Sequence, residues 1–194
     1  MTGRMLIAGV GNIFLGDDGF GPEVARRLAT AGLPGWVRVA DYGISGMHLA
    51  YDLADGYDSA ILIDAAPRGD KPGTVTLFAP TPPPRPMPDV AQERRRDAGP
   101  AAGTLGASRL FDAHGMQPDV VLGVLDMLVA ARPARILVVG CEPASTDYGM
   151  ELSEPVAAAV DEAVRVVLDL VAEAHGQDPE TTGEGVSHVP GHSR

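Results

Sequence analysis

The chain of 194 residues has the length of one domain and is long enough to bury a core without disulfides. It carries 15 basic and 26 acidic residues, a net charge of -11, which argues against a nucleic-acid-binding or anionic-membrane-binding surface and favours a protein partner. The single cysteine, Cys141, excludes an internal disulfide, and the sequence shows no signal peptide and no apolar run of about 18 residues. We expect a soluble cytoplasmic protein.

The first 28 residues predict a strand, a glycine-rich loop and a helix. Residues 5–10 form an apolar run of strand length, and the loop after it carries two adjacent carboxylates, Asp17 and Asp18. From Phe20 onward apolar residues recur at helical spacing, so that one helix face can pack back on a sheet. This order is typical of the start of an α/β fold.

The glycine-rich loop has features that argue against phosphate binding. A dinucleotide fingerprint would place glycine where Phe14 stands, and the loop has no Gly-Lys-Ser/Thr motif. Asp17 and Asp18 add negative charge, and a pair of like charges about 4 Å apart costs roughly 4 kcal/mol at an effective dielectric near 20. The loop therefore favours a cation, although capping of the following helix is an open alternative for both aspartates.

Two further predicted strands end in acidic residues. Residues 36–40 alternate apolar and polar side chains and lead into Asp41, and the apolar run 60–64 ends with Asp64. Ligands collect outside the carboxyl ends of strands in parallel sheets, so we expect these two carboxylates to converge with the two of the first loop. For Asp64 a turn or helix-capping role is the alternative.

The remaining pattern completes an α/β domain over residues 1–175. We predict a helix over 47–53, a strand over 74–78 that is antiparallel because its connection is too short for a crossover helix, a strand over 134–141, and a helix from Leu152 capped by Ser153. Cys141 at the strand end is expected to be a small buried apolar residue.

Two segments lack a periodic apolar face. Residues 80–106 contain seven prolines and a run of three arginines, and residues 176–194 are polar and glycine-rich. We predict a mobile surface loop and a disordered tail.

One histidine, His114, precedes a predicted helix with an apolar stripe from Val120 to Leu128. A lone histidine in such a place is ordinarily structural or solvated. As a ligand, it would join carboxylates at loop ends in the mixed oxygen and nitrogen set that suits nickel or zinc.

Several segments together resemble the hydrogenase maturation endopeptidases. The matching segments are Gly9-Val-Gly-Asn12, Gly16-Asp-Asp-Gly-Phe-Gly21, Asp41-Tyr-Gly-Ile-Ser-Gly46, Leu62-Ile-Asp-Ala65, Ala113-His-Gly-Met116, Val138-Val-Gly-Cys-Glu-Pro143 and Gly149-Met-Glu-Leu-Ser153. They extend over most of the chain.

This resemblance implies a fold and a set of site residues. The implied fold is a three-layer αβα sandwich around a five-stranded, mainly parallel sheet. The family's metal-binding positions correspond to Asp18, Asp64 and His114, and these would be the catalytic residues through the metal. Asp17 and Asp41 match acidic positions that support those ligands.

The resemblance also implies a function. It predicts a monomeric cytoplasmic endopeptidase that docks on the precursor of a nickel-iron hydrogenase large subunit after nickel insertion and removes its C-terminal extension. Nickel would be carried by the substrate, with zinc or another divalent ion as the alternative in the isolated protein. The metal would polarise the carbonyl, activate water or serve recognition. The rival functions are a non-catalytic nickel-sensing chaperone of the immature subunit and, less favoured, a nucleotide-binding protein.

Overall fold

The computed structural model describes residues 3–80 and 133–176. The predicted helix after Pro118, His114, nearly all of the predicted mobile loop, and the predicted tail from residue 177 onward lie outside the described residues.

Five strands and three α-helices form the described part of the chain. Their bounds are β1 Met5–Val10, α1 Phe20–Leu28, β2 Val37–Gly43, α2 Gly46–Ala54, β3 Ser59–Ala65, β4 Val75–Phe78, β5 Arg135–Cys141 and α5 Glu154–Gly176, with a short 3₁₀ helix at Gly16–Gly19 before α1. Each of these strands and α-helices was predicted within about three residues, because hydrophobic periodicity marks them clearly.

The five strands form one sheet in the order β2-β1-β3-β5-β4. Strands β2, β1, β3 and β5 pair in parallel, and β4 pairs antiparallel with β5 at the edge. The antiparallel direction of β4 confirms the sequence prediction. The chain leaves β1 to one side through α1 and reaches β3 on the other side through α2, so a topological switch point lies between β1 and β3.

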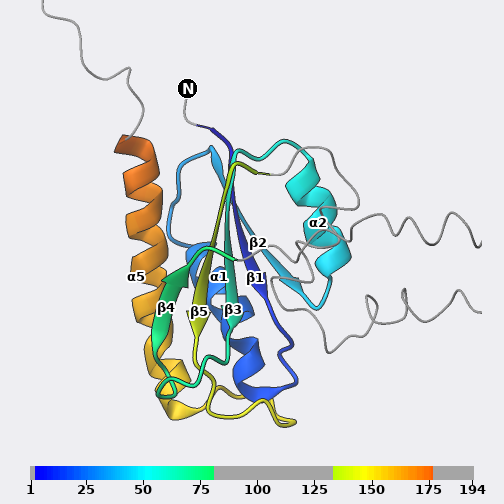
Figure 1. The fold of residues 1–194 in the computed structure, drawn as a ribbon, viewed down its shortest axis with the longest axis vertical. Helices are drawn as coiled ribbons and strands as arrows, with labels where there is room; N and C mark the ends of the chain where they lie inside the picture. Colours follow the sequence, from blue (N-terminus) through cyan, green and yellow to red (C-terminus); the bar gives the residue numbers. More distant parts are fainter. Residues whose placement is uncertain (1–2, 81–132, 177–194) are drawn as a thin grey trace, which may run out of the picture.

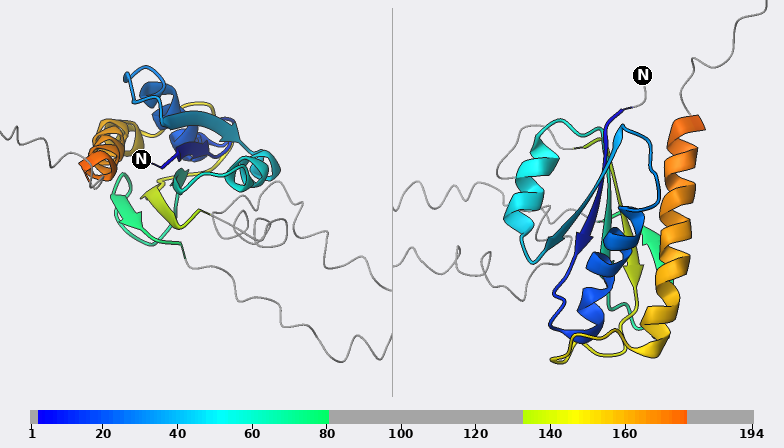
Figure 2. Two further views of the ribbon diagram at one scale, coloured as in Figure 1. Left: turned by 90° about the horizontal axis from the view of Figure 1, so that it is seen from above. Right: turned by 180° about the vertical axis from the view of Figure 1, so that it is seen from behind.

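Alternation along the strands builds two apolar layers. Met5, Ile7 and Ile63 face one side and pack with α1 and α5, whereas Leu6 and Leu62 face the other side and pack with α2. Figure 1 shows the sheet nearly edge-on between α5 and α2, and α1 lies beside α5 when the molecule is seen from behind in Figure 2. The result is the expected three-layer arrangement.

Helix α1 begins unusually close to the sheet. A Cβ added at Gly21 would lie 2.2 Å from the Val10 carbonyl oxygen and 2.3 Å from that of Ile63. Only glycine permits this approach, which brings the loop before α1 onto the ends of β1 and β3. In residues 3–80 and 133–176, no helix is long and apolar enough to span a bilayer.

Candidate functional site

The loop after β1 folds back on itself and holds Asp18 at the end of the strand. Gly11 adopts a φ of 132°, and a Cβ there would lie 1.9 Å from the Asp18 carbonyl oxygen. The next residue, Asn12, donates its backbone N–H to Asp18 Oδ2 at 2.6 Å. Two glycine-dependent close contacts, at Gly11 and Gly21, therefore place this carboxylate beside the sheet.

Asp64 lies within β3, one strand away. Asp64 is only 5% exposed. Because side chains alternate along a strand, the Asp64 side chain lies on the sheet face opposite Ile63 and helices α1 and α5. Burial raises the pKa of Asp64 well above its ordinary range, and the negative charge of Asp18 raises it further. Burial also raises the pKa of Asp18, partly opposed by the hydrogen bond from Asn12.

Asp18 and Asp64 thus form a carboxylate pair at the switch point between β1 and β3. Two desolvated like charges are unfavourable unless they share a proton or bind a cation. Of the four carboxylates predicted to converge, these two interact electrostatically, and their chemistry suits a divalent metal ion.

Asp17, the neighbour of Asp18, points to a different part of the chain. Its Oδ2 accepts the backbone N–H groups of Ala144 and Ser145 at 2.7 and 3.0 Å. Ser153 donates its N–H to Oδ1 at 2.7 Å and its hydroxyl to Oδ2 at 2.9 Å. Burial alone would raise the pKa of Asp17, but these hydrogen bonds outweigh it and lower the pKa below its ordinary value of 3.8.

Asp17 therefore fastens the β5–α5 loop to the loop after β1, and it is not directed at the carboxylate pair. Ser153 does stand at the start of α5, where its carbonyl accepts the Ala157 N–H. Its hydroxyl, expected to cap the helix, instead donates to Asp17, because an ionised carboxylate is the stronger hydrogen-bond partner.

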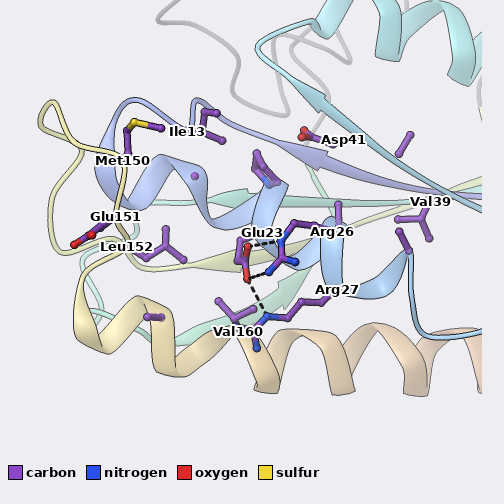
Figure 3. A pocket seen from close by; sticks show the side chains of 16 residues that line it. Ile13, Glu23, Arg26, Arg27, Val39, Asp41, Met150, Glu151, Leu152 and Val160 are labelled. Atoms are coloured by element: carbon purple, nitrogen blue, oxygen red, sulfur yellow. Dashed lines mark hydrogen bonds and ion pairs between the residues drawn. The ribbon is translucent and has the colours of Figure 1, made fainter.

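Asp41 is not brought to the carboxylate pair. Strand β2 continues past Ala40 to Gly43, and alternation puts Asp41 on the same face as Val39, on the α1 side of the sheet. Its exposed carboxylate accepts the Gly43 N–H at 2.8 Å and lines a groove beside α1 (Figure 3). Asp64 lies on the opposite face.

The third expected ligand, His114, lies outside the described residues. In the part of the chain that the structure describes, no group of three His, Cys, Asp or Glu side chains is placed to hold a metal ion. The described residues thus provide two carboxylates of the expected set.

Sequence reasoning missed one buried acid, Glu142. It accepts the backbone N–H groups of Arg68 and Gly69 at 2.6 and 3.2 Å, and these hydrogen bonds lower its pKa. Glu142 thereby orders the turn between β3 and β4. Its position directly after the predicted strand 134–141 was the available signal. Cys141 beside it is fully buried, as predicted, and burial raises the pKa of its thiol to about 12.

Comparison with known proteins identifies the family. No protein-family model matches the chain. The chain is 32% identical over 164 residues to the hydrogenase expression/formation protein HupD of Rhodobacter capsulatus, covering 83% of this chain and 68% of HupD. It is 29% identical over 178 residues to the hydrogenase 2 maturation protease of Escherichia coli, covering 88% and 92% of the two chains.

A solved structure agrees with this similarity. The hydrogenase maturating endopeptidase HybD of E. coli matches with a TM-score of 0.62 and 26% identity, over 88% of this chain and 93% of HybD. Relatives that are named proteases or endopeptidases support the enzyme interpretation over a chaperone or a nucleotide-binding protein. From its sequence, its five-stranded sheet and these similarities, the chain belongs to the hydrogenase maturation proteases.

Proposed function

We propose that this protease removes the C-terminal extension of the large-subunit precursor of a nickel-iron hydrogenase once nickel has been inserted. The observation that carries the proposal is the pairing of Asp18 and Asp64 at the switch point of the sheet, in a chain whose relatives are hydrogenase maturation proteases. The site belongs to the crevice where open α/β sheets bind ligands.

The donor set fits a divalent ion. Asp64 is a buried carboxylate whose ionised form is opposed by burial and by Asp18, so a cation would relieve both. With the imidazole of His114 as the expected third ligand, a metal ion would keep open coordination positions. In the proposed reaction the nickel belongs to the substrate. The same residues would hold zinc or a similar ion in the isolated protein.

Open coordination positions on the metal ion explain why cleavage would follow nickel insertion. A nickel ion already bound to the precursor would complete its coordination with Asp18, Asp64 and His114, so docking would depend on nickel insertion. This difference in affinity would let the enzyme reject an immature subunit.

The carboxylates of Asp18 and Asp64 could also transfer a proton during cleavage. Nickel, when bound, would polarise the scissile carbonyl, activate water or fix the precursor in place. A carboxylate oxygen that does not ligate the metal could accept a proton from the attacking water and return it to the leaving amine. Asp18 and Asp64 are the described residues proposed for this role.

The proposal is tested by a gel-shift time course on nickel-loaded and nickel-free precursor after removal of free metal. We expect cleavage of the nickel-loaded form alone, and its loss in Asp18→Ala and His114→Ala. Asp169→Ala, which changes an exposed carboxylate on α5, is the matched control and should cleave at the wild-type rate. Cleavage by Asp18→Ala at the control rate would contradict the proposed site.

A further inference from the structure

Strand β2 contains a bulge where it passes the end of β1. Asp41 pairs in register with Gly9, but the next residue of β1, Val10, pairs with Gly43, so Tyr42 is an extra residue in β2. Gly43 adopts a φ of 50°, a left-handed conformation that glycine tolerates. Bulges are common next to active sites, where they redirect the groups of the bulged strand. We call residues 41–43 the β2 bulge.

The β2 bulge touches the backbone that holds Asp18. The Gly43 carbonyl accepts the Gly11 N–H at 3.0 Å, and the next N–H along the chain, that of Asn12, donates to Asp18 Oδ2 at 2.6 Å. Gly11 also lies directly against the Asp18 backbone. A shift of the β2 bulge would therefore move the two residues that fix the Asp18 carboxylate.

The side chain of Tyr42 attaches the β2 bulge to α2. Tyr42 is 9% exposed and packs with Leu49 and Leu53 in the apolar layer between the sheet and α2 (Figure 1). Its hydroxyl donates to Oδ2 of Asp52 on α2 at 2.5 Å. Burial and the Asp52 carboxylate raise the pKa of Tyr42, so the hydroxyl keeps its proton and remains a donor. A hydrogen bond to a carboxylate is stronger than one between two neutral groups.

The acceptor, Asp52, is itself held in place. Arg38, also on β2, forms an ion pair with Asp52 Oδ2 at 3.2 Å. Arg38 also donates to the hydroxyl of Tyr57 at 3.3 Å, and the guanidinium of Arg4 lies 4.4 Å from the centre of the Tyr57 ring. Tyr57 is buried like Tyr42, at 5% exposed, but its hydroxyl meets Arg38 and not the β2 bulge. One polar network thus contains two buried tyrosines, of which Tyr42 alone belongs to the bulge.

We propose that Tyr42, through its hydrogen bond to Asp52, is a positioning residue for Asp18. The bond fixes the β2 bulge against α2, the bulge fixes Gly11, and the N–H of Asn12 then holds the Asp18 carboxylate beside Asp64. Such support is what keeps a reacting group in its productive geometry. This inference rests on the proposed function for the role of Asp18 in cleavage.

The first test observes the supporting backbone directly, in the metal-free full chain. Tyr42→Phe removes the hydroxyl and keeps the ring. We expect the amide hydrogens of Gly11 and Asn12 to exchange with solvent about tenfold faster than in wild type, because both N–H groups lose a fixed acceptor. The rates are measured by NMR and expressed relative to that of the Ile7 amide within β1, which removes any change in global stability.

The network offers a matched control. Tyr57→Phe removes a buried hydroxyl from the same network without touching the β2 bulge, so its relative rates at Gly11 and Asn12 should stay within about twofold of wild type. Asp52→Asn keeps an acceptor oxygen for Tyr42 and should behave like this control, whereas Asp52→Ala should behave like Tyr42→Phe. A purely structural role would lower the Tm of both tyrosine variants and leave the relative rates unchanged.

Cleavage of nickel-loaded precursor gives the second readout. Tyr42→Phe should lower kcat about tenfold with KM within about twofold of wild type, because the geometry at Asp18 changes and the surface of the protein does not. Tyr57→Phe should cleave at the wild-type rate.

The outcomes separate the positioning role from the proposed function. Wild-type exchange at Gly11 and Asn12 in Tyr42→Phe, or an equal rise in Tyr57→Phe, would overturn the positioning role and leave the proposed function standing. Faster exchange in Tyr42→Phe with an unchanged kcat would overturn it as well, since cleavage would then not need this support. Absence of cleavage by wild type, with exchange as expected, would contradict the proposed function and leave the connection between Tyr42 and Asp18 standing.

Discussion

Asp17→Ala should break hydrogen bonds between the loop after β1 and the β5–α5 loop, which lie far apart in sequence. Asp17 is 1% exposed and accepts hydrogen bonds from Ala144, Ser145 and Ser153, which lie 127 to 136 residues away along the chain. The substitution removes the acceptor and leaves three backbone N–H groups without it. The loop before α5, which carries Met150, would lose the four hydrogen bonds that Asp17 accepts from it and would keep the backbone hydrogen bonds that join Gly149 to Gly16 and Phe14.

The magnitude follows from the number of donors. A buried donor left unpaired costs about 1–3 kcal/mol. Water can reach part of this site, because Ala144 and Ser145 are exposed, so we expect a total loss of about 3 kcal/mol in the free energy of unfolding rather than three full penalties. For a chain of this size that corresponds to a Tm lower by about 6–12 °C.

The assay is thermal unfolding of the full chain between pH 3 and pH 7, with Asp169→Ala as the control. The pKa of Asp17 is lowered in the folded protein, so its ionised form stabilises the fold fully above the ordinary value of 3.8, and this contribution is lost as pH falls through the lowered pKa. The Tm difference between wild type and Asp17→Ala should therefore shrink below about pH 4. A Tm difference from wild type of less than about 1 °C at pH 7, equal to that of the control, would refute the claim that Asp17 holds the two loops together.

Two further predictions concern the carboxylate pair and the packing of α1. Because the pKa of Asp64 is raised in the folded protein, the native state holds more protons than the unfolded chain, so stability falls as pH rises above 3.8. In the same scans, metal-free Asp64→Asn should therefore have a higher Tm than wild type at pH 7 and an equal Tm below about pH 4. This variant should cleave no precursor. A lower Tm than wild type at pH 7 would contradict the prediction. Gly21→Ala should lower the free energy of unfolding in urea by about 3 kcal/mol, because backbone oxygens obstruct the added Cβ. Gly35→Ala, whose Cβ would have no atom within 4 Å, should change it by less than about 0.5 kcal/mol. Equal effects of the two substitutions would refute the packing argument.

The strands and helices could be predicted because each bears its own signal. The continuous apolar runs of β1 and β3, the alternation at the start of β2, and the helical spacing in α1 and α5 are local properties of the sequence. The meeting of Asp18 and Asp64 could also be predicted, since both follow or end parallel strands whose carboxyl ends share one edge.

Other site features depended on contacts that no local pattern reveals. The partners of Asp17 are more than 120 residues away, so its role in fastening a distant loop could not be read from the first loop. Asp41 was grouped with the site because strand β2 was expected to end at Ala40; its continuation to Gly43 turns Asp41 to the α1 face. Edge strand β4 was expected to be antiparallel, but its pairing with β5 rather than β3 needed the whole topology.

The central claim is most directly tested by intact-mass spectrometry of the large-subunit precursor after incubation with this protein, free metal having been removed. The account predicts that nickel-loaded precursor loses the mass of its C-terminal extension in a single cut, that nickel-free precursor keeps its full mass, and that Asp18→Ala leaves both forms intact. Equal truncation of the nickel-free precursor, or truncation by Asp18→Ala, would contradict it.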